Sequence, residues 1–333
     1  MRIDFFEIMP GEEEILSALA PAGHTIRYHH EALTLATAHL AQDADIVSVF
    51  VQSELRKELL DTLPTLKLIT TRSMGFEHID VPYARSRSIR AINVTTYASH
   101  PVAEFTFALL LAVTRRIVEA NDRLREQGIF DTAGLQGRNL FGKTLGIVGT
   151  GRIGQNVARI AHGFGMKIIA YDVHPDTSLA AQLGMTYLPL ADLISTADIV
   201  TVHVPSTPET YHLIDAAMFS HFKKGSILIN TARGEIVDTH ALIAALGDGT
   251  LRGAGLDVLE GERQLRASTA TVTSNDAAPD YPLVAANHVL LALPSVVVTP
   301  HIAFETDEAL NEIARATIES IKNFIAGTEQ HYL

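Results

Sequence analysis

The sequence predicts an α/β protein made of two doubly wound, parallel-sheet units. Three observations support this prediction. A length of 333 residues exceeds what one compact core usually holds. Short apolar runs alternate with helical patterns along most of the chain, as in parallel sheets joined by crossover helices. A strand-to-helix turn in the middle of the chain also carries closely spaced glycines, a feature of doubly wound folds.

The first hundred residues carry the smaller predicted unit. Residues 46–51 (IVSVFV) and 66–70 (LKLIT) are apolar runs of strand length, and residues 53–63 between them have a helical pattern. A third short run, residues 89–94, ends this region. Strands that alternate with helices predict a small parallel sheet.

A long helical pattern over residues 101–127 opens the larger unit. Proline suits the first helical turn, where its missing N–H has no partner to lose, and Gly128 marks the end. Strand-like runs then follow, most of them separated by helical segments, at residues 145–148, 167–171, 199–203, 226–230, 253–257 and 296–299. Residues 263–280 are polar and rich in small residues, so we expect irregular structure there. An amphipathic helix over residues 306–326 closes the pattern.

Composition excludes several classes of protein. The formal net charge of −12 argues against a nucleic-acid or membrane-surface binder, which needs a basic face. The chain has no cysteine, which excludes disulfides, thiolate catalysis and cysteine-bound metals. Its start lacks a signal-peptide pattern, and the most apolar helical stretch, residues 102–113, is too short to cross a bilayer. We therefore expect a cytoplasmic protein with no metal centre.

A glycine fingerprint predicts a dinucleotide site. Gly149, Gly151 and Gly154 form G-x-G-x-x-G between the strand LGIV and a helix that begins near Arg152 and Ile153. The first glycine permits a tight turn, the second lets the backbone approach a pyrophosphate, and the third lets the helix pack close to the strand. The free N–H groups of the helix start then face the phosphates. Glycine turns of this kind also occur for purely structural reasons.

Asp172 sharpens this prediction. It lies 18 residues beyond Gly154 (172 − 154), at the end of the next strand-like run, KIIAYD. A carboxylate there can accept both hydroxyls of the adenosine ribose and would repel a 2′-phosphate, so NAD is favoured over NADP. An aspartate in this position can also be a helix N-cap. The order strand, fingerprint, helix, strand and acid favours the cofactor role.

Three polar residues follow apolar strand-like runs, where open α/β sheets bind ligands. Arg233 follows SILINTA, Glu262 follows GLDVLEG, and His301 follows VVVTP. A reaction at the 2-carbon of a keto acid needs a cation for the carboxylate and a proton donor for the carbonyl oxygen. It also needs a carboxylate that orients this donor and keeps it protonated. The three residues offer this set.

Each of the three also has an ordinary structural explanation. A loop arginine such as Arg233 often pairs with a surface acid. Glu262 lies in an acidic run with Glu260, and such carboxylates are usually solvated. His301 is one of 15 histidines and can be a simple turn residue. Spacing alone does not bring the three together, so both interpretations stay open at this point.

Five segments carry a resemblance to a known family. In chain order they are VGTGRIG, HVP, NTARGEIVD, GLDVLEGE and TPHIAF. Together they resemble the D-isomer-specific 2-hydroxyacid dehydrogenases and, within that family, the D-lactate dehydrogenases most. The likeness runs from about residue 46 to the C-terminal helix. It implies that Arg233 binds the substrate carboxylate and carbonyl, and that His301 is the acid/base, paired with Glu262 rather than Glu260.

The resemblance also implies further site residues. Ser73, Met74 and Gly75 match a turn whose N–H groups hold the substrate carboxylate. Tyr97 matches a tyrosine near the substrate, and Phe304 an aromatic wall. Other positions match the cofactor face, namely His203, Val204, Pro205, Thr231, Ala232 and, near the nicotinamide, Asp257. Two departures are Phe50, where lactate-type members tend to have tyrosine, and residues 263–293, which form a longer stretch than in many relatives.

The family's architecture implies a discontinuous substrate domain, residues 1–98 and 300–333, with a Rossmann-like NAD domain, residues 99–299, inserted between. It also implies a homodimer formed through the helix that starts near Pro101. The apolar residues expected to face the partner there are Phe105, Phe107, Leu109, Leu110 and Val113.

The expected activity is NAD-dependent interconversion of a small 2-keto acid, pyruvate first, and the D-2-hydroxy acid. Three alternatives remain: reduction of glyoxylate or hydroxypyruvate, oxidation of phosphite, and an NAD-sensing scaffold of the same fold without catalysis. Formate oxidation is disfavoured, because formate enzymes pair the histidine with glutamine where this chain has Glu262.

Overall fold

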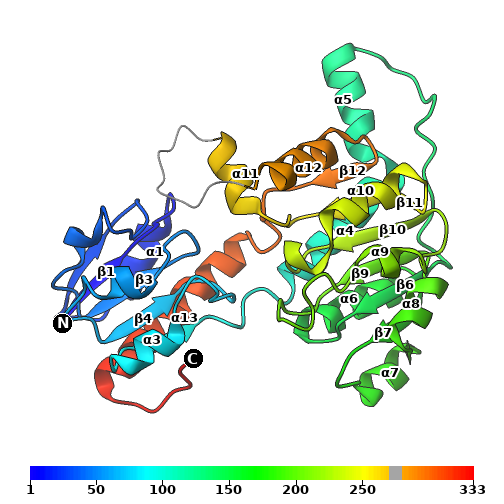
Figure 1. The fold of residues 1–333 in the computed structure, drawn as a ribbon. Coiled ribbons are helices and arrows are strands. Elements are labelled where there is room, and N and C mark those ends of the chain that lie inside the picture. Colours follow the sequence, from blue (N-terminus) through cyan, green and yellow to red (C-terminus); the bar gives the residue numbers. More distant parts are fainter. Residues whose placement is uncertain (270–279) are drawn as a thin grey trace. The chain divides into compact units, whose positions relative to one another are not determined.

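The computed structural model describes residues 1–269 and 280–333. By its internal contacts the chain divides into two compact units (Figure 1). The smaller unit contains residues 1–98 and 305–333, and the larger unit contains residues 99–304. Each unit is a parallel sheet with helices packed on it, which confirms the predicted α/β class. Within the described ranges, no helix is both long and apolar enough to span a membrane.

The smaller unit has a five-stranded sheet of order β2-β1-β3-β4-β5, with all strands parallel. Its strands are β1 (Arg2–Phe5), β2 (Thr25–Tyr28), β3 (Ile46–Val49), β4 (Leu68–Thr71) and β5 (Arg90–Asn93). Its helices are α1 (Glu12–Leu19), the short 3-10 helix η1 (Ala38–Leu40), α2 (Lys57–Leu60), α3 (Val81–Ser86) and α13 (Asp307–Ala326).

Strands β3 and β4 are buried on both faces, which explains why they lie in apolar runs of the sequence. Successive side chains of a strand point to opposite faces. Accordingly, Ile46 and Leu68 pack in one hydrophobic cluster, which also contains Ile318 of α13. Val47 and Ile69, one residue further along each strand, pack in a second cluster.

The larger unit has a seven-stranded parallel sheet of order β12-β11-β10-β9-β6-β7-β8. Its strands are β6 (Thr144–Val148), β7 (Lys167–Tyr171), β8 (Thr186–Tyr187), β9 (Ile199–Val202), β10 (Ser226–Asn230), β11 (Leu251–Leu256) and β12 (Val296–Val298). Its helices are α4 (Pro101–Arg115), α5 (Ile117–Gln127), α6 (Arg152–Gly163), α7 (Thr177–Leu183), α8 (Leu190–Thr196), α9 (Ala216–Phe219), η2 (Gly234–Ile236), α10 (Thr239–Gly247), α11 (Glu262–Thr269) and α12 (Tyr281–Ala292). The strand order reverses between β6 and β9, and such a switch point is where doubly wound sheets bind ligands.

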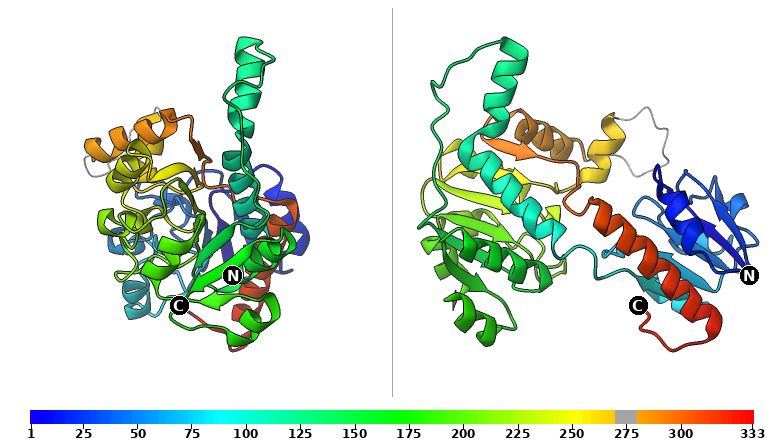
Figure 2. Two further views of the ribbon diagram at one scale, coloured as in Figure 1. Left: turned by 90° about the vertical axis from the view of Figure 1, so that its right-hand side faces the viewer. Right: turned by 180° about the vertical axis from the view of Figure 1, so that it is seen from behind.

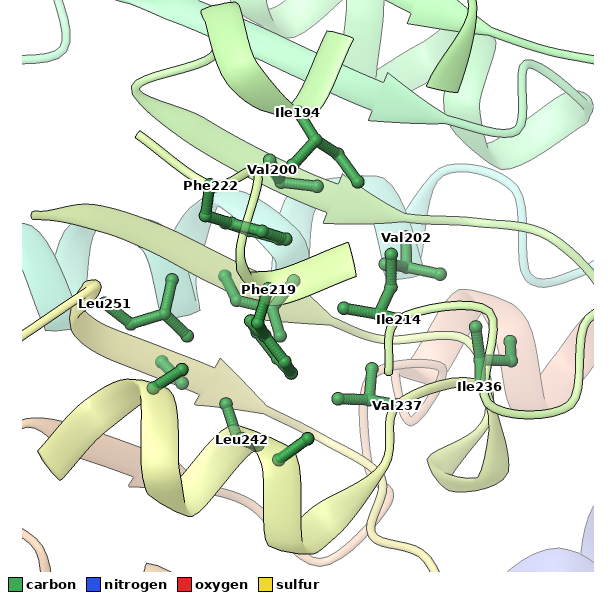
Figure 3. Close-up of a cluster of buried hydrophobic side chains, with 14 of the residues drawn as sticks. Ile194, Val200, Val202, Ile214, Phe219, Phe222, Ile236, Val237, Leu242 and Leu251 are labelled. Atoms are coloured by element: carbon green, nitrogen blue, oxygen red, sulfur yellow. The ribbon is translucent and has the colours of Figure 1, made fainter. Parts of the chain in front are cut away.

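One core cluster of the larger unit anchors a segment that matters for function (Figure 3). Val200 and Val202 of β9 meet Phe219 and Phe222 in this cluster. Ile214, Ile236 and Val237 extend the same cluster. Because Ile236 and Val237 follow Arg233 closely, burial of their side chains fixes the segment after that arginine. Full burial of one such side chain contributes about 1.5–3 kcal/mol.

The predicted helix over residues 101–127 is broken. It ends at Arg115, and Arg116 adopts left-handed backbone angles (φ 52°) before α5 begins. No glycine or proline marks this break, so the apolar pattern did not reveal it.

The expectation that the apolar face of α4 meets a partner is wrong for most of its residues. Phe107, Leu109 and Leu110 are buried in the unit's own core. Phe105 and Val113 pack against the same cluster. Glycines of β11 allow this close approach. A Cβ atom at position 255 would lie 3.1 Å from the Leu109 Cβ, and one at position 253 would lie 3.0 Å from the Val113 Cγ1.

The expectation of irregular structure over residues 263–280 is wrong at its start, because α11 covers Glu262–Thr269. Residues 270–279 lie outside the described ranges. Strands β1 and β2 and helices α1 and α3, which are four to eight residues long, were not predicted.

Candidate active site

Asp257 holds the turn that carries His301. It follows β11, it is 1% exposed, and its carboxylate accepts three hydrogen bonds. The donors are the Thr299 hydroxyl at 2.6 Å, the Ile302 N–H at 3.0 Å and the Ala303 N–H at 2.9 Å. These bonds strap the chain on both sides of His301, whose backbone is left-handed (φ 62°). A non-glycine residue in that region costs about 1–3 kcal/mol, which the straps offset.

The same bonds tie residues 300–304 to the larger unit. The family resemblance assigns these residues to the substrate domain, but here they group with the larger unit. His301 therefore belongs to the same compact unit as Glu262 and Arg233.

Glu262 and His301 form a direct pair. The His301 Nδ1 lies 2.9 Å from the Glu262 Oε1, and both side chains are about a third exposed (31% and 30%). With Nδ1 donating to the carboxylate, Nε2 is left as the ring atom that can give or take a proton. Glu260 does not share this role, because its carboxylate bonds to His212 and Thr239.

Arg233 stands at the carboxyl end of β10 in a turn fixed by Asn230. The Asn230 Nδ2 donates to the Arg233 carbonyl at 2.8 Å, and the Asn230 Oδ1 accepts from the Ala232 N–H at 3.0 Å. The Arg233 Nη1 donates to the Ala232 carbonyl at 2.8 Å. Strands β10, β11 and β12 are parallel neighbours, so Arg233, Glu262 and His301 follow carboxyl ends at the same edge of one sheet.

The glycine fingerprint has the packing that a dinucleotide site requires. Gly149 is left-handed (φ 97°), and a Cβ there would lie 2.8 Å from the His203 carbonyl carbon. At Gly154 a Cβ would lie 2.0 Å from the Gly149 oxygen. A Cβ atom added to Gly151, in contrast, would have no neighbour within 4 Å, so the space beside the second glycine is open. The N-cap position of α6 is Gly151, which has no side chain that could cap the helix.

Asp172 is bonded to this same loop. Its Oδ2 accepts from the Thr150 N–H at 2.6 Å and from the Thr150 hydroxyl at 3.0 Å, and its Oδ1 accepts from the His174 N–H at 2.8 Å. Burial alone would raise the pKa of Asp172, but these hydrogen bonds outweigh it and the pKa is lowered. The carboxylate is therefore charged at neutral pH, as discrimination against a 2′-phosphate requires.

Residues 203–205 follow β9, next to the fingerprint. Desolvation lowers the pKa of His203 to about 3, so its ring is neutral and is excluded as an acid/base near neutral pH. Its Nε2 lies 2.9 Å from the Thr201 hydroxyl, while its buried Nδ1 has no hydrogen-bond partner in the described part of the chain. Val204 is half-buried and Pro205 is exposed. The Thr231 hydroxyl lies 3.0 Å from that of Thr106 in α4, which fixes the start of the Arg233 turn.

The smaller unit holds the predicted substrate turn. The Ser73 hydroxyl lies 2.6 Å from that of Thr71 and donates to the Gly75 carbonyl at 2.6 Å. The Met74 N–H donates to the hydroxyl of the buried Tyr97 at 3.2 Å, so Tyr97 supports the turn directly. Phe304 belongs to the larger unit and is half-buried.

Two positioning groups in the smaller unit were missed by sequence reasoning. The Asn93 Nδ2 donates to the Met74 carbonyl at 2.6 Å. Glu7, a buried carboxylate with left-handed backbone (φ 58°), accepts from the N–H groups of Phe50, Gln52 and Ser53 at 3.1, 2.7 and 3.0 Å. An acid directly after an apolar run was the only available signal.

Comparison with known proteins identifies the family. Residues 107–303 match the family model described as "D-isomer specific 2-hydroxyacid dehydrogenase, NAD binding domain". A 2-hydroxyacid dehydrogenase homolog of Schizosaccharomyces pombe is 38% identical over 97% of this chain and 96% of its own. The D-lactate dehydrogenase of Escherichia coli is 34% identical over 92% and 91%. A glyoxylate reductase of Korarchaeum cryptofilum is 37% identical over 86% and 81%.

Solved structures agree. A D-lactate dehydrogenase from Aquifex aeolicus, complexed with NAD and lactic acid, matches with a TM-score of 0.84 and 36% identity over 98% of this chain and 96% of that one. The likeness is confirmed at the level of family, fold and cofactor. The protein whose glycine loop, Asp172 and Glu262–His301 pair are described above belongs to the D-isomer-specific 2-hydroxyacid dehydrogenase family and uses NAD.

Proposed function

We propose that the chain reduces pyruvate to D-lactate with NADH and also catalyses the reverse oxidation. The observation that carries the proposal is the 2.9 Å pair between His301 and Glu262, at a turn strapped by Asp257. It supplies a proton donor and acceptor held in one orientation. The similarity to D-lactate dehydrogenases and to a structure titled as the pyruvate reductase of Chlamydomonas reinhardtii (TM-score 0.87, 33% identity) favours pyruvate.

The residues divide the work as follows. Arg233 binds the keto-acid carboxylate through two parallel N–H donors, which fixes the position of C2. Bound NADH supplies the hydride that C2 receives. The protonated Nε2 of His301 gives its proton to the carbonyl oxygen, and Glu262 stabilises the charged ring before transfer. In oxidation the neutral ring takes the hydroxyl proton instead. Gly149, Gly151 and Gly154 hold the pyrophosphate.

We also propose a separate binding role for each of the two units. The larger unit binds NAD, with Asp172 on the ribose and residues 203–205, Thr231, Ala232 and Asp257 along the cofactor face. The smaller unit binds the keto acid with Ser73, Met74, Gly75 and Tyr97. Phe304 of the larger unit adds an apolar wall.

A substrate screen tests the proposal. NADH oxidation is measured with pyruvate, glyoxylate, hydroxypyruvate, 2-ketobutyrate and phenylpyruvate, and NAD reduction with phosphite. We expect the highest kcat/KM with pyruvate and D-lactate as the only enantiomer on chiral chromatography. A higher kcat/KM on another acid or on phosphite refutes the substrate assignment. The absence of turnover on all of them would favour the scaffold alternative.

We propose a homodimer that forms through α5 rather than α4. In Figures 1 and 2, α5 extends away from the sheet of the larger unit. Ile117, Val118, Leu124 and Phe130 on and after α5 are 53%, 43%, 46% and 93% exposed. Apolar side chains gathered on one projecting element are typical of a protein interface. Light scattering should give twice the chain mass, and Phe130→Asp should give a monomer; a wild-type monomer refutes this.

We also propose that the protein acts in the cytoplasm, which cell fractionation tests.

A further inference from the structure

We infer that Glu260 and His212 form a positioning pair that fixes Arg233 and Glu262 relative to each other. The inference deepens the proposed function and rests on it. Glu260 precedes Glu262 by two residues, and its Oε1 lies 2.8 Å from the His212 Nε2. Its Oε2 accepts from the Thr239 hydroxyl at 2.9 Å. The Glu260 side chain is only 13% exposed, and that of His212 is 28% exposed. The pair is therefore largely shielded from water, where a hydrogen bond is stronger than at an open surface.

The main chain of Glu260 is fixed as firmly as its side chain. Its carbonyl accepts from the Asn287 Nδ2 at 2.8 Å, and Asn287 in α12 is completely buried. From the other side the chain at Leu259 and Glu260 lies against Gly234, the residue after Arg233. A Cβ on Gly234 would lie 2.1 Å from the Leu259 carbonyl carbon and 2.3 Å from the Glu260 nitrogen. The turn before Glu262 and the turn after Arg233 are thus in direct contact.

His212 connects these two turns from a third segment. Its ring bonds to Glu260, while its N–H donates to the Glu235 carbonyl at 2.8 Å, two residues after Arg233. The Asp238 carboxylate lies 3.9 Å from its Nδ1, and the Tyr211 ring stacks on it with centroids 4.1 Å apart. The left-handed backbone of His212 (φ 50°) directs the ring into this position.

The chemical consequence follows from where the two turns lead. Arg233 must hold the carbonyl oxygen on C2 at the distance from His301 that proton transfer requires, and Glu262 sets the orientation of His301. A link between the two turns keeps that distance constant. Neither Glu260 nor His212 needs to touch the substrate for this. Both are positioning residues, not catalytic ones.

Two conservative variants test the pair. Glu260→Gln keeps the size and the Thr239 contact but removes the charge. His212→Asn tolerates left-handed backbone and is too short to reach Glu260. For each we expect kcat/KM on the keto acid to fall by about 10- to 100-fold, the range that a misplacement of about 1 Å can produce. NADH affinity, measured by fluorescence, should stay within about twofold of wild type.

A double-mutant cycle separates positioning from general destabilisation. If Glu260 acts through Glu262, then Glu260→Gln should shift the alkaline limb of reduction to lower pH. In a Glu262→Gln background it should produce no further shift. The matched control is Asp198→Asn, which removes an ion pair to Lys223 (2.6 Å) directly before β9, at the amino ends of the strands and not at their carboxyl ends. It should lower the melting temperature without moving the pH profile or kcat/KM.

The outcomes are distinct. Folded Glu260→Gln and His212→Asn proteins with wild-type kcat/KM and pH limbs overturn the inference while leaving the proposed function intact. An undiminished effect of Glu260→Gln in the Glu262→Gln background overturns it as well. A wild-type protein without turnover on any 2-keto acid overturns the proposed function and, with it, this inference.

Discussion

Replacement of Asp257 by asparagine tests the strap around His301 most directly. The carboxylate accepts three hydrogen bonds, two on Oδ1 and one on Oδ2. Asparagine keeps the size but has a single acceptor oxygen, and its NH₂ group is a donor. In either orientation of the amide, this donor faces at least one of the N–H groups of Ile302 and Ala303. One strap is lost, and one buried N–H is left without a partner.

The magnitude follows from these contacts. A hydrogen bond to a charged group contributes about 1.5–3 kcal/mol, and an unsatisfied buried donor costs about 1–3 kcal/mol. Since the two effects overlap, we expect the free energy of unfolding to fall by about 3 kcal/mol. For a domain of this size, that lowers the melting temperature by about 6–12 °C. The left-handed His301 turn loses its support, so kcat should fall by about 10- to 100-fold.

Calorimetry, steady-state kinetics and NADH titration together provide the assay. Asp215→Asn is the matched control, because Asp215 caps α9 through the Met218 N–H at 2.8 Å, and asparagine caps helices equally well. It has the same change of charge in the same unit and should leave both stability and kcat unchanged. An Asp257→Asn protein with wild-type melting temperature and kcat would refute the reasoning. A loss confined to NADH affinity would favour a direct cofactor contact by Asp257 instead.

Three further predictions concern the site itself. In the proposed mechanism Glu262 keeps the ring of His301 protonated, so Glu262→Gln should move the alkaline limb of reduction and the acidic limb of oxidation to lower pH. His203 cannot produce this shift, because its pKa is about 3, and an unshifted profile of kcat/KM against pH would contradict the pairing. Arg233→Lys keeps the charge but loses the bidentate fork, so KM for the keto acid should rise by about tenfold or more with NADH affinity unchanged; a wild-type KM would make Arg233 a structural residue. The pKa of Asp172 is lowered, so its carboxylate stays charged as pH falls, and the preference for NADH over NADPH should be constant from about pH 5 to 8. Asp172→Ser should narrow that preference, and equal kcat/KM values for both cofactors in the wild type would exclude the assigned role.

Sequence reasoning succeeded where local pattern and burial coincide. Strand β10 was predicted at its observed bounds, because all five of its residues are buried and its three central residues, 227–229, are apolar. Strand β1 was missed, since its four residues include Asp4, which is fully buried but bonded to Arg27 at 2.6 Å and to His29 at 2.8 Å. A paired buried charge has the appearance of a surface residue in the sequence.

The same difference between local pattern and tertiary contact holds for the site residues. The glycine fingerprint and Asp172 lie within one strand–helix–strand unit, so their spacing was informative. Glu262 and His301 are 39 residues apart, and which of two neighbouring glutamates meets the histidine depends on tertiary structure. The resemblance to a family indicated Glu262; spacing did not. The link through His212 to Glu260 spans 48 residues and had no sequence signal at all.

The bonds between Asp172 and Thr150 have a consequence for cofactor engineering. The carboxylate proposed to bind the ribose also accepts hydrogen bonds from Thr150 of the glycine loop, so under this proposal one connected structure recognises both halves of the adenine nucleotide. A redesign toward NADP that only exchanges Asp172 for a small or basic residue removes this anchor along with the repulsive charge. Such a variant loses affinity for both cofactors before it gains selectivity. A successful redesign has to give the Thr150 N–H a new hydrogen-bond acceptor in place of Asp172, while keeping the existing contact of 2.9 Å between the Thr150 and Tyr187 hydroxyls.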